Sequence, residues 1–365
     1  MKKIIINLKN RSYPVIVANG LFKDPNSFWP LNRGDRAVFI TNDRVGPIYL
    51  SGLCNILNRS GIITDQLILP DGEENKSLNM LDTVFTKLLK HNYDRNTMLI
   101  ALGGGVIGDL TGFAAATYHR GIRFIQVPTT LLAQVDASIG GKTSINHMLG
   151  KNMIGSFYQP VSVIIDVDSL YTLTNKDVSS GLAEIIKYAV AFDSVFFGWL
   201  ENNLDNLLAL SPEALIYCIC HCCQLKGSIV AMDERDKGIR NLLNLGHTYG
   251  HAIESYLKYR KWTHGEAVSA GIMMAVNVAL RLKIFEKIED AKRIVLLLKR
   301  ANLPIYGPKE MNPQDYLKYM LRDKKSKLGE INLVLPTSIG YAKTFFNIDP
   351  NLISFSIKEA FQLDE

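Results

Sequence analysis

The pattern of hydrophobic and polar residues divides the chain near residue 170. In the first part, short runs rich in β-branched residues alternate with helical patterns. The expected strands cover residues 4–8, 13–17, 37–41, 63–69, 98–102, 124–127 and 161–166. The clearest helical patterns between them cover residues 45–58, 78–91 and 110–117. Strands that are separated by helices in this way predict a mainly parallel sheet with crossover helices.

The second part is helical and poor in β-branched runs. Apolar residues recur at helical spacing over residues 178–202, 212–233, 244–259, 265–283, 288–301 and 312–321. A hairpin-like piece at residues 330–335 precedes a last helix near residues 351–361. Single hydrophobic cores rarely grow beyond about 250–300 residues, so a chain of 365 residues is expected to form two domains. We predict an α/β domain over residues 1–170 and an all-α domain over residues 171–365.

Composition and charge narrow the function only slightly. Hydrophobic residues make up 47% of the chain and charged residues 21%, as in ordinary globular proteins. The net charge of +6 suits an anionic small molecule, but a slightly basic surface with no special role explains it equally well. The chain has no zinc-finger spacing, RNP sequence or dense basic stripe, so we expect no nucleic-acid partner. The longest apolar stretch, residues 267–280, is too short to span a bilayer, so we expect no membrane segment.

The five cysteines favour a reducing compartment. Their number is odd, and four lie close together at Cys218, Cys220, Cys222 and Cys223, so we do not expect a disulfide framework. Cysteines without disulfides are typical of a reducing compartment, so we expect the protein to be cytoplasmic. Cys220 and Cys223 match a CxxC spacing. They lie in a continuous helical pattern without a second cysteine pair, which favours buried side chains on a core helix over a zinc or redox motif.

The most informative segment is the glycine-rich stretch that follows the strand expected at residues 98–102. Gly103, Gly105 and Gly108 satisfy GxGxxG at a strand-to-helix turn, where backbone N–H groups can approach a phosphate. The motif lies after a middle strand and lacks an acidic residue about twenty positions later, so it is not the usual dinucleotide fingerprint. The density of glycine still makes a dinucleotide the first candidate ligand.

A second candidate for nucleotide binding is the loop DGEENKS at residues 71–77. Its carboxylates could accept hydrogen bonds from ribose hydroxyls, and Lys76 could meet a phosphate. The alternative is a helix N-terminus in which acidic residues interact favourably with the helix dipole. Spacing alone does not separate the two interpretations.

Titratable residues in the helical part have the spacing of a metal site. Glu184 and Lys187 lie three apart on an otherwise apolar helix, and burying both is costly unless they pair or bind something. His247 and His251 share another helix face, and His264 follows closely. A carboxylate and two imidazoles with one open position are typical of catalytic zinc, and a remaining group could act as acid or base. The spacing does not decide which of His247 and His251 is the ligand.

Further cations and amides lie near this group in the sequence. Arg240 and Asn244 precede His247, Lys226 lies on the preceding helix, and DKK follows at residues 323–325. Around a metal, such groups would suit a substrate with carboxylate and phosphate groups. Taken singly, each is better explained as a solvated surface residue unless the fold brings the groups together.

With these residues in place, the chain resembles the 3-dehydroquinate synthase family over almost its full length. The resemblance rests on eight segments: residues 71–77, 103–122, 126–146, 150–160, 181–189, 240–254, 264–272 and 323–325. It implies an N-terminal Rossmann-like domain, a helical C-terminal domain, NAD, and one divalent metal, usually zinc with cobalt as a possible substitute. It also implies a homodimer in which Arg120 reaches the phosphate of the neighbouring subunit's substrate.

The resemblance assigns roles to individual residues. It implies that Glu184, His247 and His264 ligate the metal, and that His251 is then the acid–base or hydrogen-bonding partner. Positions that match NAD contacts are Asn42, Asp71, Glu73, Lys76, Gly104, Gly105, Asp109, Thr129, Thr130, Lys142, Lys151 and Thr172. Positions that match substrate contacts are Arg120, Asp136, Asn152, Lys187, Lys226, Arg240, Asn244 and one of Lys324 and Lys325. Catalytic roles fall to His251, Lys187, Lys142, which lies close to both cofactor and substrate, and Lys226.

The family's reaction converts 3-deoxy-D-arabino-heptulosonate 7-phosphate into 3-dehydroquinate and phosphate, a step of the shikimate pathway of aromatic amino acid biosynthesis. It implies transient oxidation at C5 by NAD, β-elimination of phosphate, return of the hydride and an intramolecular aldol closure. One alternative is another sugar phosphate cyclase, but Asn152, Arg240 and Asn244 match the dehydroquinate pattern, where those relatives typically differ. A metal-dependent polyol dehydrogenase shares the two-domain plan and would accumulate NADH.

Overall fold

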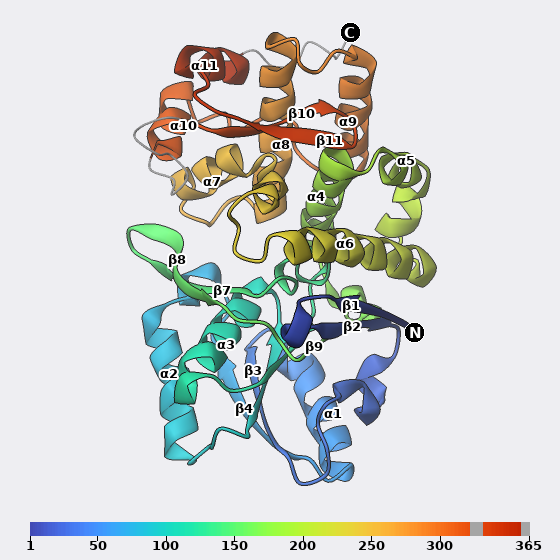
Figure 1. The fold of residues 1–365 in the computed structure, drawn as a ribbon, viewed down its shortest axis with the longest axis vertical. Coiled ribbons are helices and arrows are strands. Elements are labelled where there is room, and N and C mark those ends of the chain that lie inside the picture. Colours follow the sequence, from blue (N-terminus) through green and yellow to red (C-terminus); the bar gives the residue numbers. More distant parts are fainter. Residues whose placement is uncertain (322–330, 359–365) are drawn as a thin grey trace. The chain divides into compact units, whose positions relative to one another are not determined.

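The computed structural model describes residues 1–321 and 331–358. Contacts between residues divide the chain into two compact units (Figure 1). Unit 1 comprises residues 1–173 and 212–235, and unit 2 comprises residues 174–211 and those from 236 onward. The change at residue 173 lies close to the expected division at residue 170. The segment 212–235, expected in the helical half, groups with the sheet instead.

Unit 1 contains a seven-stranded sheet in the order β1-β2-β9-β6-β5-β3-β4. The strands are β1 (Lys2–Ile6), β2 (Tyr13–Ala18), β3 (Arg36–Asn42), β4 (Ile63–Leu69), β5 (Met98–Gly103), β6 (Phe124–Pro128) and β9 (Ser162–Asp166). Only the β1–β2 pair is antiparallel, so the prediction of a mainly parallel sheet is confirmed. Every strand of this sheet begins and ends within two residues of its predicted bounds.

Apolar side chains on both faces of the central strands explain why helices cover the sheet on both sides. On β3, Val38 and Ile40 face one core while Ala37 and Phe39 face the other. The first core is completed by α2 (Leu78–Lys90) and α3 (Gly105–Thr117), and the second by α1 (Gly46–Arg59) (Figure 1). Because the six neighbouring strands from β2 to β4 run in parallel, their carboxyl ends meet at one edge, where open α/β sheets bind ligands.

The hydrophobic pattern of the sequence did not predict the hairpin of β7 (Lys142–His147) and β8 (Gly150–Phe157). Its strands pair only with each other, and β7 packs on α3. Gly155 lies where a Cβ would be 2.1 Å from the Thr143 carbonyl oxygen, so only glycine permits this approach of the two strands. Asn152 in β8 has a φ of 53°, a conformation that asparagine adopts more readily than most residues.

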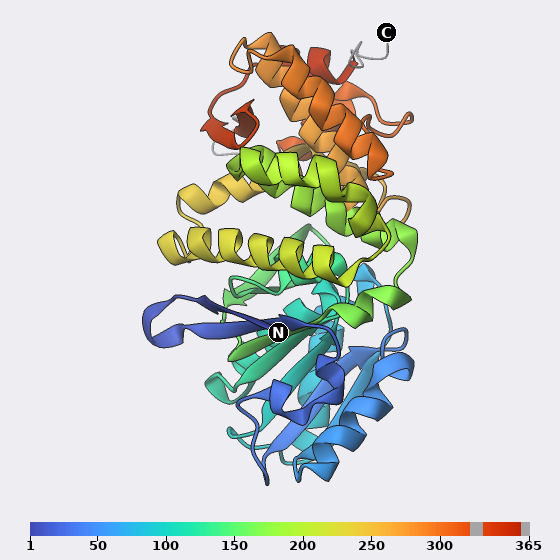
Figure 2. The ribbon, with the colours of Figure 1, turned by 90° about the vertical axis from the view of Figure 1, so that its right-hand side faces the viewer.

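Helix α6 (Pro212–Met232) belongs to unit 1 and packs on β1 and β2 (Figure 2). Cys218, Cys222 and Cys223 are fully buried along it, whereas Cys220, the other residue of the CxxC spacing, is only partly buried. By length and composition α6 is the one described helix that could cross a membrane, but half of its most apolar window is buried inside the protein. A core helix passes the same test of length and composition, so α6 is weak evidence for a membrane segment.

Unit 2 is built from helices around the buried helix α8 (His264–Arg281). The other helices are α4 (Asn175–Phe192), α5 (Ser194–Leu208), α7 (His247–Tyr256), α9 (Ile288–Arg300), α10 (Pro313–Met320) and α11 (Pro350–Lys358). The late hairpin is present as β10 (Leu333–Ser338) and β11 (Tyr341–Phe345). One helix expected over residues 178–202 is two, because Asp193 leaves the helical conformation and its side chain caps α5 by accepting from the Phe196 N–H.

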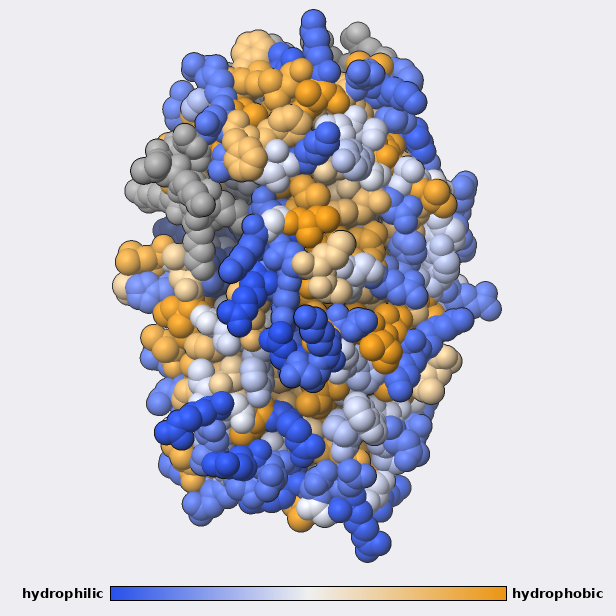
Figure 3. All heavy atoms as spheres, viewed as in Figure 1, coloured by the Kyte–Doolittle hydropathy of each residue, from blue (hydrophilic) through white to orange (hydrophobic). Residues whose placement is uncertain are grey.

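Hydrophilic and hydrophobic residues are intermixed on the face of the molecule drawn in Figure 3. Exposed apolar side chains such as Val195 and Leu296 are single positions on helices that also carry charged residues. Scattered exposed apolar residues of this kind are normal for a folded protein and require no partner to explain them.

Candidate metal and nucleotide sites

Three side chains from three helices of unit 2 converge on one point. Glu184 of α4, His247 of α7 and His264 of α8 each offer a ligand atom, and these atoms lie within 4.8 Å of one another. Glu184 Oε1 is 3.4 Å from His247 Nε2 and 3.5 Å from His264 Nε2. A carboxylate oxygen and two imidazole nitrogens form a donor set that suits a catalytic zinc ion, and three protein ligands leave a position for substrate.

Neighbouring groups fix which atom each residue presents. His247 Nδ1 lies 3.2 Å from the Leu245 carbonyl oxygen, which can only accept, so Nδ1 carries the proton and Nε2 keeps its lone pair. His264 Nδ1 lies 3.1 Å from Glu254 Oε1, with the same consequence for its Nε2. Lys187 donates to Glu184 Oε2, so Oε1 is the carboxylate atom that faces both histidines. All three ligand atoms are thus oriented for a cation.

The electrostatics of this group favour metal over protons. Burial is the main reason that the pKa of His247 lies well below its usual value, and Lys187 and the other two histidines lower it further, against the effect of Glu184. Metal ligands must be deprotonated, so a histidine that stays neutral needs no proton release before it binds. Glu184 and Lys187 are each only 1% exposed, a costly burial of charge that their mutual contact partly offsets.

His251 lies beside the three ligand candidates without joining them. Its ring centroid is 5.5 Å from that of His247 and 6.5 Å from that of His264. It is not a member of the group whose ligand atoms converge. Of the two histidines that spacing left open, His247 therefore belongs to the group that could hold a metal ion, and His251 lies next to that group.

A close approach of two helices holds this arrangement. A Cβ on Gly265 would lie 2.2 Å from the Ser180 carbonyl oxygen of α4, and the Gly265 N–H donates to Ser180 Oγ at 3.0 Å. Only glycine permits this contact. Because Gly265 directly follows His264 and Ser180 lies one turn before Glu184, the contact sets the separation of these two candidate ligands.

We expect Gly265→Ala to destabilise the protein by about 1–3 kcal/mol, the usual cost of overpacking, and to weaken metal binding because α8 must move away from α4. Urea unfolding and zinc competition with a chelator measure the two effects. Gly198→Ala on α5 is the matched control, because a Cβ there meets nothing within 4 Å and should add about 0.5–1 kcal/mol of stability. Equal zinc affinity in both variants would show that the approach does not set the site.

The other predicted site residues of unit 2 lie just before α7. Arg240 is buried and Asn244 is partly buried in the short 3-10 helix Ile239–Asn244. Asn244 Nδ2 donates to the backbone oxygen of Asn241 at 2.8 Å, which orients the amide. Lys324 and Lys325 lie outside the described residues.

In unit 1, predicted nucleotide contacts gather at the carboxyl ends of the parallel strands. Asn42 ends β3 and Asp71 follows β4, and Asn42 Nδ2 donates to Asp71 Oδ1 at 2.5 Å. Thr130 follows β6, and its Oγ1 accepts from the Ala133 N–H. Thr172 Oγ1 lies 2.6 Å from the Tyr49 hydroxyl. These residues therefore occupy the edge at which open α/β sheets bind ligands.

The glycine turn at this edge fits a phosphate group. Helix α3 begins after Gly104 without a side-chain cap, so the N–H groups of its first turn have no partner within the helix. A Cβ on Gly105 would lie 3.2 Å from that of Ala137, so the turn has little room for side chains. Thr129 Oγ1 is buried, and within the described part of the chain it has no hydrogen-bond partner. An anionic ligand would satisfy such donors, so these residues fit a dinucleotide.

Lys76 is the centre of a buried polar network beside the glycine turn. Its Nζ lies 2.5 Å from Asp109 Oδ2 on α3 and 2.5 Å from Asn152 Oδ1 on β8. Ser144 Oγ of β7 lies 3.1 and 3.0 Å from the same two oxygens and can donate its one proton to either. Burial raises the pKa of Asp109, and the Lys76 ammonium opposes that shift. The network joins the loop at residues 71–77, α3 and the hairpin.

Glu73 makes the second connection between this loop and the hairpin. Its Oε1 accepts from Asn146 Nδ2 at 2.8 Å and lies 4.0 Å from Lys151 Nζ. The Asn146 N–H donates to the Lys76 carbonyl oxygen, and Asn146 Oδ1 accepts from the Asn152 N–H. The DGEENKS loop was interpreted either as a nucleotide contact or as a simple helix N-terminus. A simple helix N-terminus does not explain the loop, because the loop's side chains contact elements that are distant in sequence.

The remaining predicted residues of unit 1 lie in separate places. Lys226 of α6 is buried, and its Nζ contacts Asp136 through the carboxylate at 3.0 Å and the backbone oxygen at 2.7 Å. Lys142 is exposed at the start of β7. Arg120 is exposed after α3 and has a φ of 64°.

Three residues that lie in these networks were not predicted from the sequence. Ser144 and Asn146 lie on the hairpin that the pattern did not predict. Glu254 contacts His264, and its spacing of three from His251 and seven from His247 on one helix was a usable signal.

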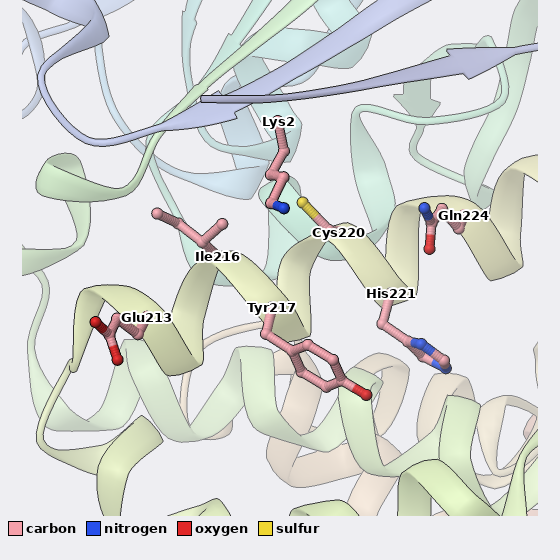
Figure 4. A pocket seen from close by; sticks show the side chains of 7 residues that line it. All are labelled: Lys2, Glu213, Ile216, Tyr217, Cys220, His221 and Gln224. Carbon is pink, nitrogen blue, oxygen red and sulfur yellow. The ribbon is translucent and has the colours of Figure 1, made fainter.

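A groove of about 430 Å³ beside α6 contains no predicted site residue (Figure 4). Its lining residues are Lys2, Glu213, Ile216, Tyr217, Cys220, His221 and Gln224. Lys2 of β1 and Cys220 of α6 point toward one another there. Burial raises the pKa of the Cys220 thiol to about 11, so it stays protonated and is a poor metal ligand or nucleophile.

Comparison with solved structures first places the fold in a class. A 2-deoxy-scyllo-inosose synthase, solved with carbaglucose-6-phosphate, NAD+ and Co2+, superposes with a TM-score of 0.90 at 25% identity. The match covers 99% of this chain and 100% of that one. The fold is therefore that of the sugar phosphate cyclases, and the predicted combination of a mainly parallel α/β domain with a helical remainder is confirmed.

Sequence relatives identify the family within this class. Family models described as 3-dehydroquinate synthase N-terminal and C-terminal match residues 66–180 and 181–326. The 3-dehydroquinate synthase of Blochmanniella pennsylvanica is 69% identical over 98% of this chain and 99% of its own length. That of Blochmanniella floridana is 65% identical over the same shares. The chain belongs to the 3-dehydroquinate synthase family, which confirms the resemblance and the predicted enzyme class.

Proposed function

We propose that the protein converts 3-deoxy-D-arabino-heptulosonate 7-phosphate into 3-dehydroquinate and phosphate, with NAD in unit 1 and one divalent metal in unit 2. The observation that carries this proposal is the convergence of Glu184, His247 and His264 in a chain 69% identical to a 3-dehydroquinate synthase. The cofactors follow from the donor groups described above and from the NAD+ and Co2+ of the related synthase structure. Zinc is the proposed metal.

When bound, NAD supplies a reversible hydride acceptor, and the metal supplies a Lewis acid that lowers the pKa of a hydroxyl group. The chain's own residues bind and orient the substrate and transfer protons. His251 is proposed to exchange a proton with a substrate hydroxyl through its imidazole, since it lies beside the ligands without belonging to them. Lys187 is proposed to donate hydrogen bonds from its buried ammonium group and to hold Glu184 in its ligand orientation.

Buried cations suit the two anionic groups of this substrate. Lys226 of unit 1 and Arg240 of unit 2 are only 6% and 2% exposed. Ammonium and guanidinium groups form strong charge-assisted hydrogen bonds with carboxylates and phosphates. We propose both as contacts of the substrate carboxylate, with Asp136, Asn152 and Asn244 as orienting groups and Lys142 close to both cofactor and substrate.

The proposed NAD contacts are those that gather at the carboxyl edge of the sheet or on the loops and hairpin beside it. They are Asn42, Asp71, Glu73, Lys76, Gly104, Gly105, Asp109, Thr129, Thr130, Lys142, Lys151 and Thr172. We further propose a cytoplasmic homodimer in which Arg120 contacts the phosphate of the partner's substrate, with no nucleic-acid or membrane partner.

One assay tests the reaction. The purified protein is incubated with the heptulosonate phosphate, catalytic NAD and zinc, while phosphate, dehydroquinate and NADH are followed. We expect equal amounts of phosphate and dehydroquinate without lasting NADH. Glucose 6-phosphate, which lacks the carboxylate, is the control substrate and should release no phosphate. Turnover of glucose 6-phosphate would favour another sugar phosphate cyclase, and stoichiometric NADH would favour a polyol dehydrogenase.

A further inference from the structure

Glu254 is a buried carboxylate to which neither sequence pattern nor family resemblance gave a role. It lies on α7, is 4% exposed, and its Oε1 is 3.1 Å from His264 Nδ1 on α8. His247, His251 and Glu254 follow one another at spacings of four and three, so they share one face of α7. Burying a carboxylate is costly, so its retention in a mostly apolar interior requires a partner.

We propose that Glu254 is a positioning residue of the metal site, acting through His264. As an acceptor-only group it holds the His264 proton on Nδ1, keeps Nε2 directed at Glu184, and makes the imidazole a stronger base. The inference rests on the proposed metal site of unit 2, and it adds a residue that never touches the metal.

The two histidine ligands differ in a way that makes Glu254 testable. His247 Nδ1 faces the neutral carbonyl oxygen of Leu245, whereas His264 Nδ1 faces a carboxylate. A charged acceptor forms a stronger hydrogen bond than a neutral one and donates more charge through the ring. Losing that charge should weaken the bond from His264 to the metal and leave the His247 bond unchanged.

Glu254→Gln keeps the shape and an acceptor oxygen but removes the charge, and Glu254→Leu removes both. We expect zinc affinity, measured by competition with a chelator on the full chain, to fall about 10–100-fold in Glu254→Gln and at least as far in Glu254→Leu. The visible absorption of the cobalt-loaded protein should change as well, because a purely structural role would leave the metal coordination, and therefore the spectrum, unaltered.

Glu266→Gln on α8 is the matched control. Glu266 lies two residues from His264 but caps α8 through the Thr263 N–H and pairs with Lys176 at 3.1 Å, without a contact to a ligand candidate. The Glu266→Gln variant should bind zinc as tightly as the wild type. Equal losses in Glu266→Gln and Glu254→Gln would overturn the inference, because any nearby carboxylate would then serve.

The same experiment separates this inference from the proposed function. If the wild type binds zinc but Glu254→Gln binds it within twofold of the wild type, the inference is wrong and the metal site stands. A wild type that binds no zinc overturns the metal site and the inference together. Glu254→Gln is close in shape to the native residue, and urea unfolding of the metal-free proteins checks that it remains folded.

Discussion

His247→Ala is expected to lose the bound metal and all measurable synthase activity, whereas His251→Ala should keep the metal and lose most of the rate. His247 Nε2 lies 3.4 Å from Glu184 Oε1 and carries a lone pair because its Nδ1 proton faces the Leu245 carbonyl. Removing it leaves two ligands, too few for a stable zinc site. His251 lies outside the ligand group, and loss of a general acid or base costs roughly 10²–10⁴-fold in kcat.

Metal content by atomic absorption and steady-state kinetics at saturating NAD measure both effects. His221→Ala is a suitable control, because this histidine lies on α6 of unit 1, stacks on Tyr217 and has no proposed role in the reaction. It should retain both metal and rate. Metal content that fell equally in His247→Ala and His251→Ala would contradict the ligand assignment, as would full metal loading of His247→Ala.

The site was predictable from the sequence where its residues share one helix. The roles of its residues stayed ambiguous where they depend on how several helices are arranged. Glu184 and Lys187 were paired by their spacing of three, and that contact is present. His247 and His251 are equivalent by spacing, and only the positions of α4 and α8 distinguish them. Glu254 was visible as a third residue on the same face, but its buried carboxylate has a function only because α8 brings His264 to it.

The fold was predictable where burial gives the hydrophobic residues of a strand or helix a regular spacing in the sequence. The central strands β5, β6 and β9 are buried along their whole length, and these strands were predicted close to their observed ends. The hairpin at residues 142–157 was not, because its pairing depends on glycine at position 155 and on Asn146 and Lys76, rather than on alternating hydrophobicity. The grouping of α6 with unit 1 was also missed, since helical periodicity shows that a face is buried but not against which core.

Lys76→Met is expected to destabilise the protein by about 3 kcal/mol and to abolish NAD binding. The Lys76 side chain is 5% exposed, and its Nζ lies 2.5 Å from Asp109, whose side chain is 17% exposed. Removing one partner of a buried pair leaves an uncompensated charge, which costs about 3–5 kcal/mol, and the partial exposure of Asp109 places this case at the low end. The same change removes the contact that joins the loop at residues 71–77 to α3.

Lys87→Met is the matched control for this prediction. Lys87 pairs with Asp65 at 2.7 Å in the same unit, but the two side chains are 20% and 30% exposed, and such pairs contribute about 0–1 kcal/mol. Urea unfolding of the ligand-free proteins and NAD titration followed by calorimetry measure the two effects. Lys76→Met combined with Asp109→Asn should recover part of the lost stability but none of the NAD affinity, because the buried charge is gone while the proposed nucleotide contacts remain missing. If the Lys76→Met single variant were no less stable than Lys87→Met, solvent rather than Lys76 would compensate the charge of the Asp109 carboxylate.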